Sequence, residues 1–81
     1  MKYNTTGVCA RTIDIEMDGT KVKSVNFNGG CNGNGQGIGA LVKDMEASEV
    51  IKRCKGIKCG MKSTSCPDQL AKALEKYLQE N

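Results

Sequence analysis

Residues 11–27 read Arg-Thr-Ile-Asp-Ile-Glu-Met-Asp-Gly-Thr-Lys-Val-Lys-Ser-Val-Asn-Phe, and this stretch decides the fold. Its first half alternates apolar and polar residues, which is typical of a strand with one buried face. The Asp18-Gly19 pair separates that half from a second apolar run ending at Phe27. Asp-Gly between two such runs predicts a β-hairpin, because both turn positions require positive φ. The apolar positions shift from even to odd after Val22, which predicts a bulge.

The segments around the hairpin complete the predicted fold. Residues 3–9 favour another strand, interrupted at Gly7, and residues 28–39 form a glycine-rich loop. Three helices then follow from apolar residues at helical spacing. The predicted fold class is α+β: an N-terminal antiparallel β-hairpin or meander, a Gly-rich loop and three helices, in a single domain of residues 1–81. The apolar residues that define the helices are Ile38, Leu41, Val42 and Met45, then Val50, Ile51 and Cys54, then Leu70, Ala73, Leu74, Tyr77 and Leu78.

Two helix ends carry recognisable signals. Gly56 is expected to close the second helix, because glycine readily adopts the left-handed conformation at a C-terminal cap. Ser65 with Asp68 three residues later resembles a capping box, and Pro67 lies in the first turn that this box would start. We therefore expect the third helix to begin at Ser65.

The composition suggests a small core that needs additional stabilisation. The chain has 81 residues, with one Phe, two Tyr and no Trp. Domains of this size commonly gain stability from a metal, disulfides or oligomerisation. We predict a cytoplasmic protein, because the N-terminus has no secretory signal, and no stretch is long enough to span a membrane. Cytosolic thiols are normally reduced, which favours metal or redox roles over structural disulfides.

The charge is mildly positive, and its distribution is uneven. The formal net charge is +3, too small to indicate nucleic-acid binding, and we expect none. Residues 50–67 contain five basic residues and no acidic one. This block is either a solvated surface or a set of cations that compensates a negatively charged metal–thiolate site.

Five cysteines and no histidine make the thiols the main candidates for chemistry. No two are spaced as Cys-x2-Cys, so zinc-ribbon and thioredoxin motifs are absent. Cys54 falls on the apolar face of the second helix and is expected to be a core residue. The remaining four lie at a strand end, in loops or at a helix start, and we predict that they bind zinc. An alternative is a redox-active dithiol made by two of them, Cys59 and Cys66. The predicted metal ligands are Cys9, Cys31, Cys59 and Cys66.

The glycine-rich stretch suggests another kind of binding. A glycine-rich segment between a strand and a helix can hold a phosphate group through its backbone N–H groups. No Lys-Ser or Lys-Thr follows it, and the alternative is a tight loop that presents Cys31. Under the binding hypothesis, the ligand is a nucleotide or flavin, and the residues that would bind this cofactor are Gly33, Asn34, Gly35, Gly37, Lys58 and Lys62.

No catalytic residue is predicted. Without histidine, hydrolysis by a Ser–His or Cys–His pair in its usual form is excluded. The carboxylates Asp14, Glu16 and Asp18 follow the solvent-facing period of the hairpin and do not form an acid–base pair.

Residues 64–68, Thr-Ser-Cys-Pro-Asp, resemble the motif that names the TSCPD domain family. The resemblance extends through 29–34, 37–38, 56–60 and 68–71, and so covers essentially the whole chain. The family includes a C-terminal domain of adenosylcobalamin-dependent (class II) ribonucleotide reductases. The resemblance implies an accessory, metal-binding module with a protein partner in a ribonucleotide reductase-type system, and therefore a link to DNA synthesis. Its four cysteines correspond to Cys9, Cys31, Cys59 and Cys66. The reductase barrel, radical cysteine loop and cobalamin site are lacking, so we do not expect this chain to catalyse the reductase reaction alone.

Overall fold

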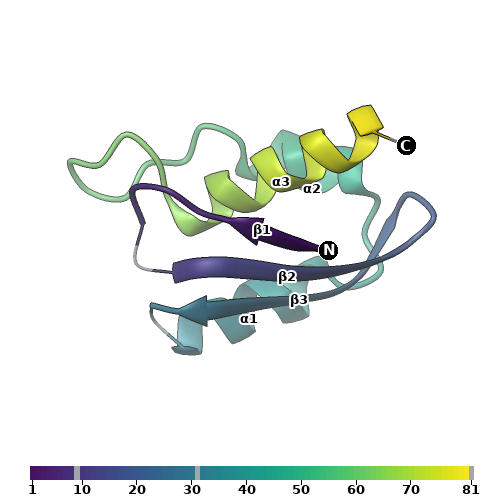
Figure 1. The fold of residues 1–81 in the computed structure, drawn as a ribbon, viewed down its shortest axis with the longest axis horizontal. Helices are drawn as coiled ribbons and strands as arrows, with labels where there is room; N and C mark the ends of the chain where they lie inside the picture. The colour runs from purple at the N-terminus through teal and green to yellow at the C-terminus, as the bar shows by residue number, and fades with distance from the viewer. Residues whose placement is uncertain (9, 31, 81) are drawn as a thin grey trace.

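A computed structural model of the chain describes residues 1–8, 10–30 and 32–80. An antiparallel sheet comes first and the helices follow, which confirms the predicted α+β class (Figure 1). The elements are β1 (Lys2–Asn4), β2 (Ala10–Asp18), β3 (Lys21–Gly29), α1 (Asn32–Val42), α2 (Ala47–Cys54) and α3 (Cys66–Glu80).

The sheet has the order β1-β2-β3 with antiparallel neighbours. Gly19 adopts a φ of 61° in the turn between β2 and β3, as the Asp-Gly signal predicts. The predicted bulge is also present, because Glu16 pairs with Ser24 while Met17 pairs with Val22. β1 is shorter than the predicted strand over residues 3–9, since the pairing with β2 ends at Asn4.

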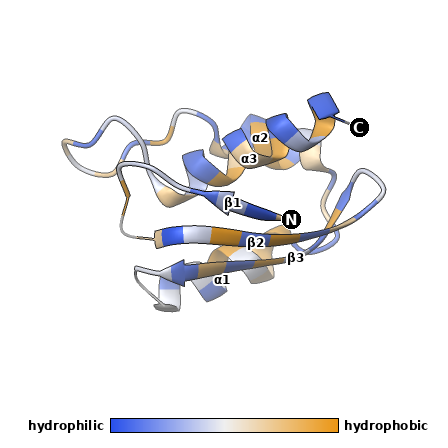
Figure 2. Ribbon diagram, viewed as in Figure 1, coloured by the Kyte–Doolittle hydropathy of each residue, from blue (hydrophilic) through white to orange (hydrophobic). Residues whose placement is uncertain are grey.

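One face of the sheet forms the core with the helices. Ile13, Ile15, Val22 and Val25 of the hairpin are buried. Figure 2 shows apolar segments along β2 and on α3. In Figure 1, α2 and α3 lie on the side of the sheet where β1 is, and α1 lies next to β3. The opposite face is polar, as the alternation requires. The helical residues buried with the hairpin are Val42, Ala47, Val50, Leu70, Ala73 and Leu74.

Helix α1 differs most from the prediction. It begins at Asn32, inside the segment predicted as a Gly-rich loop, and ends at Val42. Leu41 was expected on the apolar face, but 78% of its surface is exposed. Met45 lies beyond the helix, where its carbonyl accepts a 2.8 Å hydrogen bond from the N–H of Val22. Among the described residues of the predicted loop, Gly29 and Gly30 precede the helix with positive φ, at 87° and 72°.

Close packing against β3 explains two of the four glycines of α1. A Cβ on Gly39 would lie 2.8 Å from the backbone oxygen of Val25, a distance that requires the backbone to move. A Cβ on Gly35 would lie 3.2 Å from Cβ of Phe27. Side chains at these positions would push the helix off the strand, so tertiary contact compensates for the poor helix propensity of glycine.

The predicted ends of α2 and α3 are confirmed. Gly56 follows α2 with a φ of 88°, and the N–H of Lys55 donates to the carbonyl of Ile51 at 2.9 Å. α3 begins directly after Ser65, which caps it. No helix in the described part of the chain is both long enough and apolar enough to cross a lipid bilayer.

Candidate functional site

The candidate site is organised by residues 64–68 at the start of α3. The N–H of Asp68 donates to the hydroxyl of Ser65 at 3.2 Å, which is the expected capping interaction. The same hydroxyl donates to the carbonyl of Ile57 at 2.7 Å. Ser65 therefore caps the helix and also fixes the start of the loop that follows α2.

The carboxylate of Asp68 is the centre of a buried polar network. Only 3% of this residue is exposed. Its oxygens accept hydrogen bonds from the Thr64 hydroxyl and, at 2.7 Å, from the N–H of Gly56, and Lys72 lies 3.4 Å away. The hydrogen bond from Thr64, followed by that from Gly56, holds the pKa of Asp68 below its ordinary value despite burial. An ionised Asp68 thus ties the end of α2 to the start of α3.

Gln69 extends this network to the N-terminal segment. Its amide nitrogen donates to the Thr64 hydroxyl at 2.9 Å, and its amide oxygen accepts from the N–H of Thr6 at 3.2 Å. Gly7 lies against Thr64, since a Cβ on Gly7 would be 3.2 Å from Cγ2 of Thr64. Sequence reasoning included Thr64 and Gln69 in the family motif but gave neither of them a structural role. The sequence feature that could have indicated a role is that each is an uncharged polar residue directly next to the capping pair, Thr64 before Ser65 and Gln69 after Asp68.

Two of the four predicted metal ligands lie at this end of the molecule. Cys66 is the first residue of α3 and is half-buried. Cys59 is exposed in the preceding loop, and its N–H donates to the carbonyl of Thr64 at 3.2 Å.

The other two predicted ligands, Cys9 and Cys31, lie outside the described residues. The described residues around them share the same end of the sheet. Ala10 pairs with Gly29 across β2 and β3, and Gly7 contacts Thr64. Within the described residues, no three Cys, His, Asp or Glu side chains form a group that could hold a metal ion. In chemical type, four cysteines fit zinc, which favours tetrahedral thiolate coordination.

Cys54 belongs to a different environment. It is half-buried on α2 and packs against the core cluster from its edge, whereas the prediction had it buried within the core. Burial raises the pKa of its thiol, and Arg53 only partly offsets this effect. A thiol that is harder to ionise is a poorer metal ligand and nucleophile than an ordinary one.

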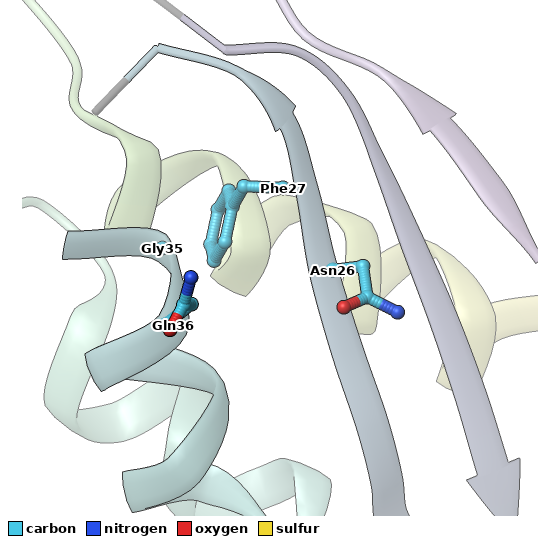
Figure 3. A pocket seen from close by; sticks show the side chains of 4 residues that line it. All are labelled: Asn26, Phe27, Gly35 and Gln36. Carbon is cyan, nitrogen blue, oxygen red and sulfur yellow. The ribbon is translucent and has the colours of Figure 1, made fainter. Parts of the chain in front are cut away.

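The residues predicted to bind a nucleotide or flavin lie in two places. Gly33, Asn34, Gly35 and Gly37 are in α1, so the open phosphate loop that the hypothesis assumed is instead helical. Its backbone N–H groups beyond the first turn bond to carbonyls of the same helix. In Figure 3 the Phe27 ring stands over Gly35 and Gln36, around a hollow of about 50 Å³. That volume holds a water molecule but no nucleotide.

The basic block lies partly on and directly after α2 and partly in the loop that carries Cys59. Arg53 contacts Glu49 at 2.9 Å, and Lys55 contacts Glu75 at 2.8 Å. Lys58 and Lys62 lie exposed in the loop that carries Cys59. The charge-compensation hypothesis therefore concerns the part of the block that shares a loop with Cys59.

Comparison with known proteins gives one match. The sequence model of the TSCPD domain matches residues 1–78. Neither the curated proteins nor the solved structures contain a match to the chain.

Proposed function

Because the chain belongs to the TSCPD domain family, we propose that it is an accessory module whose four cysteines bind zinc as a structural ion. The proposed ligands are Cys9, Cys31, Cys59 and Cys66. Zinc would join the end of the sheet, the loop after α2 and the start of α3. A small core of aliphatic side chains gives such a cross-link a clear stabilising role.

One observation carries the proposal: the described neighbours of the four cysteines are connected to one another. The chain before Cys9 is hydrogen-bonded to α3 from the N–H of Thr6 to Gln69, and Cys59 is hydrogen-bonded to Thr64 just ahead of Cys66. Gly29, close to Cys31 in sequence, pairs with Ala10, which follows Cys9. These contacts support convergence of the four thiols at one end of the molecule.

We further propose a protein partner in a ribonucleotide reductase-type system, a relation that is general to the family. Ile57 and Met61 are exposed apolar residues in the loop that carries Cys59. Lys58 and Lys62 flank them in sequence. An apolar surface with basic neighbours suits a partner with an apolar, acidic surface.

Native mass spectrometry and metal analysis of protein purified without added zinc test the metal site. We expect about one zinc per chain, and loss of the folded circular-dichroism signal when a strong chelator removes it. Cys66→Ser should lose the zinc, whereas Cys54→Ser, the matched control, should keep it. A stable fold with less than about a tenth of an equivalent of any metal would contradict the proposal.

A second candidate is a thiol redox protein, favoured by the exposure of Cys59 and by Cys66 at the start of a helix. Here the two thiols would pass two electrons and two protons to a partner disulfide and form a disulfide themselves. Alkylation rates separate the candidates: a redox pair has one thiol that reacts faster than Cys54 near neutral pH. A zinc site protects both thiols until the metal is removed.

A further inference from the structure

A second candidate site lies at the other end of the hairpin. Met17, Asp18, Lys21, Lys23, Lys43 and Asp44 line a hollow of about 440 Å³. They come from the ends of β2 and β3 that meet at the turn, and from the connection between α1 and α2. The Ala10–Gly29 pair, close in sequence to Cys9 and Cys31, marks the opposite end of the same two strands. The hollow is therefore separate from the proposed zinc site.

The backbone around the hollow departs from regular structure at two places and is fixed by hydrogen bonds. Lys23 is the extra residue of the bulge, because Val22 pairs with Met17 and Ser24 pairs with Glu16. Bulges redirect side chains and are common beside binding sites. Asp44 has a φ of 68°, the left-handed conformation that side chains seldom adopt, and its N–H donates to the carbonyl of Val22 at 2.7 Å. Two local departures from regular structure thus place Lys23 and Asp44 around the same space.

In the part of the chain that the structure describes, the lysines of the hollow form no ion pair with a carboxylate. Arg53, Lys55 and Lys72 each contact a carboxylate, at distances of 2.9, 2.8 and 3.4 Å. Among the described residues, no ion pair involves Lys21, Lys23 or Lys43, although Asp18 and Asp44 line the same hollow. Ammonium groups gathered around one space repel each other, and a bound anion would relieve that repulsion.

We propose that this hollow binds the phosphate groups of a small phosphorylated ligand. Lysine is a common phosphate-binding residue and acts as a point charge that needs no fixed geometry. The volume of about 440 Å³ is within the range of small-molecule sites. Met17 provides an apolar wall for an organic part of the ligand.

An NMR titration of the full-length chain with two probes, inorganic tripolyphosphate and ATP, tests this site. At an ionic strength of about 0.15 M, we expect saturable shifts of the amides of residues 21–24 and 43–45. The triple variant Lys21→Gln, Lys23→Gln, Lys43→Gln should weaken binding by about tenfold or more. Equal affinity for both probes indicates that the site binds the phosphate chain alone. Tighter binding of ATP indicates that its nucleoside part also makes a contact, which we assign to Met17.

A variant that loses the same charge elsewhere distinguishes a specific binding site from general electrostatic attraction. Lys2→Gln, Lys52→Gln, Lys76→Gln removes the same charge from exposed positions outside the hollow and should keep the affinity within about twofold. Equal weakening in both triple variants, shifts that map elsewhere, or no saturable shift at millimolar probe would overturn the proposal. Lys43→Gln alone serves as a second variant if the triple one does not fold.

Discussion

The packing of α1 on β3 predicts opposite effects for the same substitution two residues apart. Gly37→Ala and Gly39→Ala both replace a helical glycine that has no positive φ. A Cβ on Gly37 meets nothing within 4 Å, whereas a Cβ on Gly39 would lie 2.8 Å from the Val25 backbone oxygen. The two variants share the change in chain entropy and differ in the contact with β3.

The expected magnitudes follow from these two terms. Alanine in place of glycine inside a helix stabilises by about 0.5–1 kcal/mol, which is the whole effect expected for Gly37→Ala. Gly39→Ala gains the same amount but must displace backbone, and overpacking costs about 1–3 kcal/mol. The free energies of unfolding of the two variants should therefore differ by about 1–3 kcal/mol, with Gly37→Ala the more stable.

Urea unfolding followed by circular dichroism measures this difference, with both variants held in the same metal state. Melting temperatures give a second readout, since about 1 kcal/mol shifts a domain of this size by about 4–8 °C. Gly33→Ala is a further control, because its Cβ also meets nothing within 4 Å. If Gly39→Ala is as stable as Gly37→Ala, the close approach of α1 to β3 is wrong.

Two further perturbations address the network and the thiols. Asp68→Asn should destabilise the fold by about 2 kcal/mol or more, because a carboxylate that accepts several hydrogen bonds is lost from a buried site. The folded pKa of Asp68 is lowered, so the unfolded chain binds a proton more readily, and stability rises with pH. Urea unfolding from about pH 6 down to pH 2 should show wild-type stability falling from just above the ordinary aspartate pKa. Wild-type stability should keep falling as the pH passes through the lowered pKa of Asp68 in the folded protein. A parallel fall of equal size in Asp68→Asn would contradict this reasoning. Cys54→Ala should lower stability by about 1 kcal/mol through lost packing, and thiol alkylation should show Cys54 reacting more slowly than Cys59 in metal-free protein.

The hairpin and the helix caps were predictable because local chemistry determines them. Asp18-Gly19 requires a tight turn whatever surrounds it, and the change of period after Val22 indicated the bulge. Ser65 and Asp68 specify a helix start within three residues, and Gly56 marks a helix end. Each of these signals is a backbone constraint that neighbouring residues satisfy without help from distant parts of the chain.

Helix α1 was not predictable in the same way, because its determinants are tertiary. Four glycines at alternate positions favour a loop when propensity alone is considered. The helix forms since Gly35 and Gly39 permit contact with Phe27 and Val25, a contact that the sequence does not reveal. The exposure of Leu41 follows from the same arrangement, because the face of α1 that meets β3 is the one that carries Gly35 and Gly39.

The role of Asp68 was predictable only in part. Capping explains the hydrogen bond between its N–H and Ser65, but its carboxylate instead accepts from Gly56 and Thr64. Those partners precede it by twelve and four residues, and no local rule connects them. Gln69 was missed because its burial depends on Thr64 and on the N-terminal segment together.

At the start of α3, most polar side chains hold the fold together, and one is available to bind something outside it. Every described buried side-chain nitrogen or oxygen atom has a hydrogen-bond partner within the molecule. Thr64, Ser65 and Asp68 therefore need no ligand, since their capacity is already used to connect the loop, the helix and the N-terminal segment. Within residues 64–68, the thiol of Cys66 is the group left to act on something outside the fold. A change in the scaffold should then alter metal affinity indirectly, through the position of Cys66 relative to Cys59.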